Sequence, residues 1–347
     1  MNTRTLGTLT VSEIGMGCMG LSHGYGEIPN HDYSIEAIRR AYDAECTFFD
    51  TAEAYGPNLA PENRGHNERL VGEAVEPFRN KVVLATKLHL DTTEVAQAGL
   101  EATIRAHLAA SLERLRTDHV ELYYLHRVNT QIPLEDVARV MARLIDEGLI
   151  GGWGLSQVSV EMLDRAHQTC PVTAVQSIYS MVERGLEESV IPYCQARGIG
   201  VVAFSPIASG LLAGTLTAQS DFSHADDVRK FVPQLKPENL AANQPIVDLL
   251  RQVASAKVAT PAQISLAWML HKWPHVVPIP GSKHQERILE NLGAAAVTLT
   301  DHEFSQLEDA LEALPVAGHR GHVQVEGESM ASWGAHEKRT RNAPSAS

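Results

Sequence analysis

The feature that most constrains the fold is an alternation of short apolar runs with amphipathic stretches along almost the whole chain. Most of these runs are continuously apolar, as expected for parallel strands that are buried on both faces. We predict an opening hairpin over Thr5–Val11. Eight strands are expected to follow it, over Glu13–Gly17, Thr47–Asp50, Val82–Lys87, Val120–His126, Gly151–Ser156, Ala174–Ser180, Gly200–Pro206 and Val276–Pro280.

The amphipathic stretches predict helices that connect these strands. One of them stops at Gly148, a residue type common just past a helix end. The predicted helices are Leu100–Leu115, Leu134–Glu147, Val160–Thr169, Glu187–Arg197, Pro261–Lys272 and Gln285–Ala295. Eight strand–helix units are typical of a (β/α)₈ TIM barrel or of a large doubly wound sheet. We expect residues 1–315 to form a single barrel domain with extra loops at its C-terminal face.

Two regions interrupt this alternation of predicted strands and helices. The segment Ser209–Gln244, between the seventh and eighth strands, is long and polar, and we expect it to form a lid or binding loop. Residues 316–347 are expected to form a partly flexible tail, with the small and polar residues 341–347 disordered.

Charge excludes some classes of partner. Acidic residues outnumber basic ones by 42 to 29 in this chain of 347 residues, which gives a net charge of −13. Such a surface repels phosphate backbones, so we expect no nucleic-acid partner. The N-terminus lacks the apolar stretch of a secretory signal, and no apolar run approaches the length that spans a bilayer. We therefore expect a cytoplasmic protein that does not enter membranes.

No metal site is predicted. His271 and His275 are four residues apart, but Pro274 interrupts the helix that would align them. The cysteines are scattered and form no C-x-x-C motif, so buried free thiols are expected at Cys18, Cys46, Cys170 and Cys194.

A glycine motif near the N-terminus suggests a different fold. Gly15 to Gly20 matches G-x-G-x-x-G, and Asp50 ends the next predicted strand, as in dinucleotide-binding Rossmann folds. That motif requires a helix to begin inside the glycine run and to face the pyrophosphate. Two further glycines and Pro29 follow closely, which disfavours an immediate helix. We therefore interpret these glycines as part of a loop at the barrel mouth.

Reactive side chains follow three consecutive predicted strands. Asp50 ends the second strand and Tyr55 lies in its loop, while Lys87 ends the third strand and His126 the fourth. Each of these residues alone could have an ordinary structural role, such as capping a turn, lying as a cation in solvent or packing in the core. In a TIM barrel, however, the carboxyl ends of the strands carry the chemistry. The four together predict an active site at the mouth.

Several stretches in chain order resemble the aldo-keto reductase family, from about Thr5 to about Leu314. They read FFDTAEAYG, LATK, SLERLRTDHVELYYLHRV, GGWGLSQVS, VQSIYS, FSPIASGLLAG and PIPGSKHQERILEN. The resemblance implies a barrel, NADPH/NADP⁺ as the cofactor and a catalytic tetrad of Asp50, Tyr55, Lys87 and His126.

The residue types suit carbonyl reduction, which needs a hydride at carbon and a proton at oxygen. A phenol with a pKa of about 10 is a weak acid at neutral pH unless a neighbouring cation lowers its pKa. Lys87 could supply that cation, and Asp50 could hold it charged and oriented. His126 could donate a second hydrogen bond to the carbonyl oxygen.

The resemblance also implies a set of cofactor contacts. Hydrogen bonds to the nicotinamide carboxamide would come from Ser156, Gln157 and Gln176, and Phe204 would provide the aromatic platform for the ring. The pyrophosphate would lie against Ser205, Pro206, Ile207, Gly210 and Leu211. The remaining contacts would be Met19, Asp50, Gly281, Ser282, Lys283, Arg287, Glu290 and Asn291. The cations Lys283 and Arg287 could both meet an adenosine 2′-phosphate, which favours NADPH over NADH.

The chain departs from the family pattern at several positions. Phe204 replaces the commoner Tyr or Trp, Ile178 stands where Glu is frequent, and Asn129 stands where Asp often follows H-R-V. The loop over residues 56–67 and the tail look particular to this chain, and both are expected to shape the substrate pocket.

The leading hypothesis is an NADPH-dependent enzyme that reversibly reduces a small-molecule aldehyde or ketone to an alcohol. An alternative is a nucleotide-sensing protein of the same fold with little turnover, similar to potassium-channel β subunits. The intact tetrad favours the enzyme. A Rossmann-type dehydrogenase is the third and weakest reading.

Overall fold

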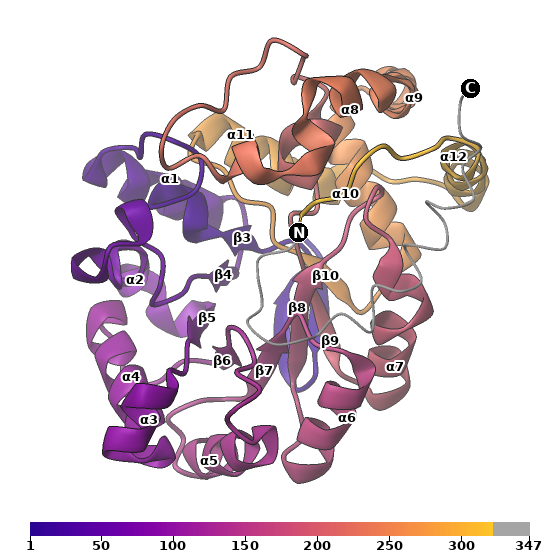
Figure 1. The fold of residues 1–347 in the computed structure, drawn as a ribbon. Helices are drawn as coiled ribbons and strands as arrows, with labels where there is room; N and C mark the ends of the chain where they lie inside the picture. Colours follow the sequence, from indigo (N-terminus) through magenta and orange to yellow (C-terminus); the bar gives the residue numbers. More distant parts are fainter. Residues whose placement is uncertain (322–347) are drawn as a thin grey trace.

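A parallel sheet of eight strands forms the centre of the computed structural model, which describes residues 1–321 (Figure 1). The strands pair in sequence order from β10 to β3, each parallel to its neighbour. Their bounds are β3 (Met16–Gly17), β4 (Phe48–Asp50), β5 (Val83–Leu88), β6 (Leu122–Leu125), β7 (Trp153–Ser156), β8 (Ala174–Ile178), β9 (Gly200–Phe204) and β10 (Val276–Pro278). A Rossmann sheet reverses its strand order at a switch point, so this sequential order excludes both the Rossmann and the doubly wound readings.

Backbone hydrogen bonds between the first and last strands close the sheet into a barrel. The Gly15 amide donates to the Pro278 carbonyl (3.0 Å), and the Gly17 amide donates to the Pro280 carbonyl (3.3 Å). A Cβ at Gly17 would lie 2.8 Å from the Ile279 carbonyl oxygen, so the seam requires glycine at that position. Gly17 therefore belongs to β3 and serves barrel closure, and not a mouth loop as predicted, although it does line the cavity at the mouth.

Apolar side chains pack on both faces of the sheet, inside the barrel and between the strands and the helices. Phe48, Tyr124 and Val202 belong to a small interior cluster, whereas their chain neighbours pack outward against the helices. Leu6 and Val11, from the hairpin β1 (Thr3–Leu6) and β2 (Leu9–Ser12), complete the interior cluster. Leu6 packs on Gly200 at the start of β9, so the hairpin plugs the N-terminal end of the barrel. The carboxyl ends of the strands form the other end.

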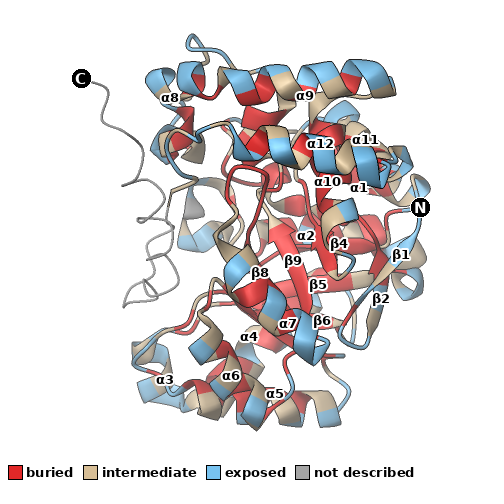
Figure 2. Cartoon of the chain, turned by 90° about the vertical axis from the view of Figure 1, so that its right-hand side faces the viewer, coloured by how far each residue is buried: buried red, intermediate tan, exposed pale blue. Residues whose placement is uncertain are grey.

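Helices surround the sheet, and the buried residues concentrate on the strands and on the inner helix faces (Figure 2). In α5, six buried apolar residues follow helical spacing, which explains why this segment folds as a helix against the sheet. The helices are α1 (His31–Asp43), α2 (His66–Val75), α3 (Thr92–Ala98), α4 (Leu100–Leu115), α5 (Leu134–Asp146), α6 (Val160–Thr169), α7 (Val190–Arg197), α8 (Pro237–Ala242), α9 (Gln244–Lys257), α10 (Pro261–Lys272), α11 (Gln285–Leu292) and α12 (Asp301–Glu312). None of the helices within residues 1–321 is long and apolar enough to cross a membrane.

The predicted hairpin and all eight predicted strands are confirmed, with most strands shorter than expected. Four of the six predicted helices differ by no more than one residue from the structure, whereas α7 begins three residues later than predicted and α11 ends three residues earlier. The expectation that no helix follows the glycine motif is wrong in detail, because a single 3₁₀ turn spans Cys18–Leu21. The four cysteines are buried free thiols, as expected.

The segment 209–244 is less irregular than expected. It contains three 3₁₀ turns and α8, and α9 begins at its end. Its middle is joined to the loop after β3, since the Gly26 amide donates to the Asp226 carbonyl (3.2 Å) and the Val228 amide donates to the Gly24 carbonyl (3.0 Å). The side chains of His23 and Asp226, both buried, meet at 2.7 Å. Two loops far apart in sequence therefore form one bridge at the mouth.

The described part of the tail packs on this end of the molecule. Asn243 exchanges two hydrogen bonds with the Ala317 backbone, and the His319 carbonyl accepts from the Gln234 amide (3.1 Å). The segment 341–347, expected to be disordered, lies outside the described residues.

Candidate active site

The four side chains predicted from strand ends meet at the C-terminal mouth. Lys87 is completely buried, and its Nζ donates to Asp50 Oδ1 (2.5 Å), to the Thr51 carbonyl (2.7 Å) and to Tyr55 Oη (3.3 Å). Gln176 Nε2 donates to the other Asp50 oxygen (2.7 Å). The ammonium thus has three acceptors in fixed positions, and one of them is the phenol.

Burial and neighbouring charges shift the pKa values of Lys87 and Tyr55 in opposite directions. Burial disfavours a charged Lys87, but Asp50 and Tyr55 outweigh that effect and raise the lysine pKa. Burial also raises the pKa of Tyr55 above its ordinary value, although Lys87 acts to lower it. Lys87 acts on the phenol pKa in the expected direction, but desolvation of the phenolate is the larger effect, so the Tyr55 pKa is raised and not lowered. Tyr55 keeps its proton well above neutral pH.

A pair of imidazoles faces Tyr55. The His126 ring lies edge-on to the Tyr55 ring, with centroids 5.7 Å apart, and the His89 ring lies 4.4 Å from that of His126. Burial, His89 and Arg127 lower the pKa of His126 well below its ordinary value, and burial and Arg127 lower that of His89 to about 4. Both rings are therefore neutral near pH 7, where each has one N–H to donate. His126 Nδ1 is buried without a hydrogen-bond partner among residues 1–321.

A cavity of about 1010 Å³ opens from Tyr55 and His126 and extends to the start of α11. Most residues of the predicted cofactor set line it. They are Met19, Asp50, Ser156, Gln176, Phe204, Ser205, Pro206, Ile207, Gly210, Gly281, Ser282, Lys283, Arg287, Glu290 and Asn291. The structure therefore places one end of the predicted cofactor site beside the tetrad.

Three of the predicted site residues are not in the cavity wall. Lys87 lies behind Asp50 and Tyr55. Leu211 is buried in the hydrophobic core beneath the loop. Gln157 turns its side chain toward β8, where Oε1 accepts the Ile178 amide (3.1 Å). None of residues 56–67 lines this cavity, contrary to the expectation that this loop shapes the pocket.

The backbone around this cavity is strained. Ser205, Ala208 and Ser209 have φ angles of 53°, 49° and 55°, and Gly210 has a φ of 101°. Such conformations are costly for residues with a Cβ, and they cluster where a loop must present its backbone to a ligand. The Ser209 hydroxyl is buried without a hydrogen-bond partner in the described part of the chain. A polar ligand with hydrogen-bonding oxygens, such as a nucleotide, fits this loop.

Two cations stand at the far end of the cavity. Lys283 Nζ donates to the carbonyls of Tyr25 (2.9 Å) and Glu27 (3.0 Å), so it holds the loop after β3. Arg287 forms an ion pair with Glu290 at 2.6 Å and remains partly exposed. Both predicted phosphate-binding cations therefore reach the cavity, and each already has an acceptor.

Sequence reasoning missed part of the wall, namely His23, Tyr25, His89, Arg127, Arg229, Phe231 and Arg320. His89 had a signal, since it lies two residues after Lys87 and directly past the end of β5, where the alternation of strand faces still indicates the same side. Arg127 follows His126 directly, and it donates to Ser156 Oγ (2.9 Å). Arg320, which donates to Ser205 Oγ (3.0 Å), comes from the tail and had no local signal.

Comparison with known proteins identifies the family of this chain. The model of the Aldo/keto reductase family matches residues 13–312. A probable aldo-keto reductase of Glycine max is 35% identical over 314 residues, which cover 89% of this chain and 88% of that protein.

Solved structures agree on the fold. A glycerol dehydrogenase from Gluconobacter oxydans superposes with a TM-score of 0.78 at 23% identity, covering 94% of this chain and 99% of that one. An aldo-keto reductase from Klebsiella pneumoniae in complex with NADPH gives a TM-score of 0.69 at 28% identity, covering 93% of this chain and 100% of that one.

Proposed function

Because the chain belongs to the aldo/keto reductase family, we propose that it reversibly reduces an aldehyde or ketone to an alcohol with NADPH. The observation that carries the proposal is the contact of the buried Lys87 ammonium with both Asp50 and Tyr55 at the cavity floor. A relative bound to NADPH supports the choice of cofactor.

The roles of the four residues follow from their contacts. Tyr55, protonated because its pKa is raised, would donate its proton to the carbonyl oxygen as negative charge develops there. Lys87 would stabilise the phenolate that remains, and Asp50 would keep Lys87 charged and in place. His126, a neutral imidazole, would donate a hydrogen bond to the same oxygen. Positioned proton transfer of this kind typically contributes about 10²–10⁴-fold to the rate.

The cofactor would lie along the cavity. When bound, NADPH supplies a hydride from nicotinamide C4. Ser156 and Gln176 would hold the carboxamide, and Phe204 would stack on the ring. The strained backbone from Ser205 to Gly210 would meet the pyrophosphate, and Arg287 would meet the 2′-phosphate.

A steady-state assay tests the proposal. We expect the purified protein to oxidise NADPH in the presence of members of a panel of aldehydes and ketones, and to use NADH less well. Tyr55→Phe should remove turnover and keep NADPH binding. Tight NADPH binding without turnover on any carbonyl would instead support the nucleotide-sensing alternative, and absence of binding would contradict both.

A further inference from the structure

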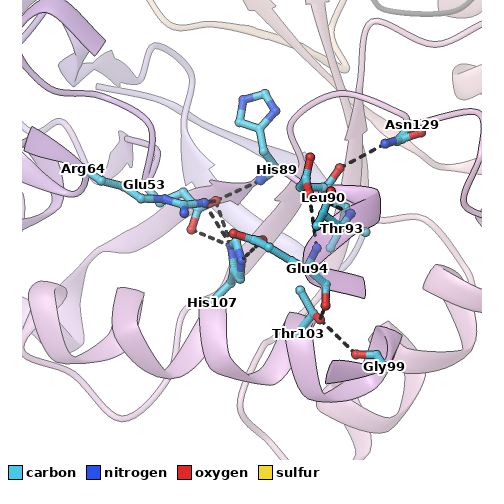
Figure 3. A network of polar contacts seen from close by, with 11 residues as sticks. Glu53, Arg64, His89, Leu90, Thr93, Glu94, Gly99, Thr103, His107 and Asn129 are labelled. Carbon is cyan, nitrogen blue, oxygen red and sulfur yellow. Dashed lines mark hydrogen bonds and ion pairs between the residues drawn. The ribbon is translucent and has the colours of Figure 1, made fainter. Parts of the chain in front are cut away.

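Glu53 is a buried carboxylate that the proposed reaction does not use. It is 2% exposed and lies on the loop between β4 and Tyr55. Arg64 Nη2 donates to Oε1 (2.6 Å), and His107 Nδ1 lies 2.9 Å from Oε2 (Figure 3). Two basic side chains, one from the loop before α2 and one from α4, therefore enclose a single carboxylate.

The same carboxylate holds the end of β5. Glu53 Oε1 accepts the His89 amide (2.9 Å), and the Glu53 amide donates to the Lys87 carbonyl (3.2 Å). The His89 ring points away from this network in Figure 3 and packs against His126. Hydrogen bonds thus join Glu53 to the segment that carries Lys87 and His89. The chain itself joins Glu53 to Tyr55, which lies two residues further on.

We propose that Glu53 is a positioning residue for carbonyl reduction. It fixes the distance between Tyr55 and Lys87, and it fixes the position in which the His89 ring packs against His126. Arg64 and His107 are its anchors. The loop over 56–67 then has a function at the site without lining the cavity, because the Gly65 amide donates to the Glu53 carbonyl (2.6 Å) and Arg64 holds its carboxylate. This inference rests on the proposed function.

The charges around Glu53 agree with this role. Burial acts to raise the Glu53 pKa, but His107 and Arg64 outweigh it, and the pKa is lowered. The bond to Glu53 raises the pKa of His107. His107 also meets Glu94 of α3 (3.0 Å). The charge of Glu53 also acts on His89 and on the buried Tyr123. The carboxylate is therefore ionised at neutral pH and is held by ionic contacts.

The other end of the same strand carries a matched cluster. Glu121 Oε2 accepts the Leu84 amide in β5 (2.7 Å), and Glu121 Oε1 accepts from Arg79 Nη1 (2.9 Å). His119 Nε2 lies 3.2 Å from the same oxygen. A glutamate, an arginine, a histidine and a backbone amide of the β5 segment thus recur at the N-terminal end, although the partners are divided differently between the two carboxylate oxygens. Conservation of that end in a TIM barrel serves stability, so Glu121 is a chemical control for Glu53.

The test compares Glu53→Gln with Glu121→Gln in the full chain, beside the wild type and Tyr55→Phe. Glutamine keeps the size of glutamate and removes its charge. We expect Glu53→Gln to lower kcat about tenfold or more, since small misplacements of reacting groups have large effects on rate. Its dissociation constant for NADPH should be unchanged. Glu121→Gln should lower the melting temperature and leave kcat at the wild-type value.

Amide hydrogen exchange supplies a readout that does not depend on turnover. Glu53→Gln should speed exchange at both His89 and Tyr55, whereas Glu121→Gln should speed it at Leu84. A kcat for Glu53→Gln equal to that of Glu121→Gln would overturn the proposal, as would faster exchange at His89 with none at Tyr55. A wild type without turnover would refute the proposed function, and the exchange result would still decide the positioning role.

Discussion

Tyr55 combines two properties that set the pH dependence of the reaction. It is the proposed acid, and burial raises its pKa above 10 despite the opposing effect of Lys87. Reduction needs the protonated phenol, so the rate of reduction should stay level through neutral pH and fall only above pH 10. The reverse oxidation needs the phenolate and should rise over the same range. A profile of kcat/KM against pH checks this, and a reduction limb that falls near pH 7 would contradict it.

Arg287 is the residue on which cofactor choice should depend. Lys283 is already held by two carbonyl groups, whereas Arg287 is partly exposed beside the cavity. A charge-assisted hydrogen bond contributes about 1.5–3 kcal/mol, and each 1.4 kcal/mol is about tenfold in affinity. Arg287→Ala should therefore raise KM for NADPH about tenfold or more and leave KM for NADH unchanged. Equal changes for both cofactors would show that Arg287 does not recognise the 2′-phosphate.

The tetrad could be predicted because each of its members lies at the C-terminal end of a strand or in the loop that follows it, and these ends meet at one mouth in a barrel. The direction in which the pKa of Tyr55 is shifted could not be predicted, because the shift depends on burial, which is a property of the folded chain. The same holds for Arg320, which reaches Ser205 across 115 positions in sequence. Local patterns carry no information on such contacts.

The strands were predictable because burial on both faces leaves a continuous apolar run, which is readable in sequence. Some helices were missed for a different reason. In α1 only five of thirteen residues are buried, and the buried side of α2 includes the polar residues Asn67 and Glu68, so the apolar pattern of both helices is weak in the sequence. α12 had a readable signal, since Thr300 and Glu303 form a capping box at its start.

The bridge between the loop after β3 and the segment 209–244 is the element whose motion should govern cofactor exchange. Asp226 meets His23 within it, and both are buried at the mouth. Asp226→Asn should weaken the bridge, so that NADPH dissociates faster in a stopped-flow experiment. Asp221→Asn is the control, because within residues 1–321 the side chain of Asp221 bonds only to Ser223 of its own exposed loop. Equal dissociation rates in the two variants would show that the bridge does not retain the cofactor.

At the scale of the whole molecule, a barrel plugged at one end presents one open mouth, and the tail adds to that mouth. We propose that residues 1–315 fold as one unit. A chain ending at residue 315 should melt cooperatively but bind NADPH more weakly than a chain ending at residue 321, because it lacks Arg320. The comparison isolates residues 316–321. Failure of the shorter chain to melt cooperatively would place the domain boundary later.

In the proposed reaction, Tyr55 and the bound cofactor act on one carbonyl at this mouth. A single-turnover experiment can follow deuterium from NADPH labelled at nicotinamide C4 into the product, for the wild type and Tyr55→Phe. We expect deuterium on the carbinol carbon for the wild type, and a rate at least about 10²-fold lower in the variant with NADPH still bound. Equal rates of transfer in the two proteins would contradict the proposed reaction.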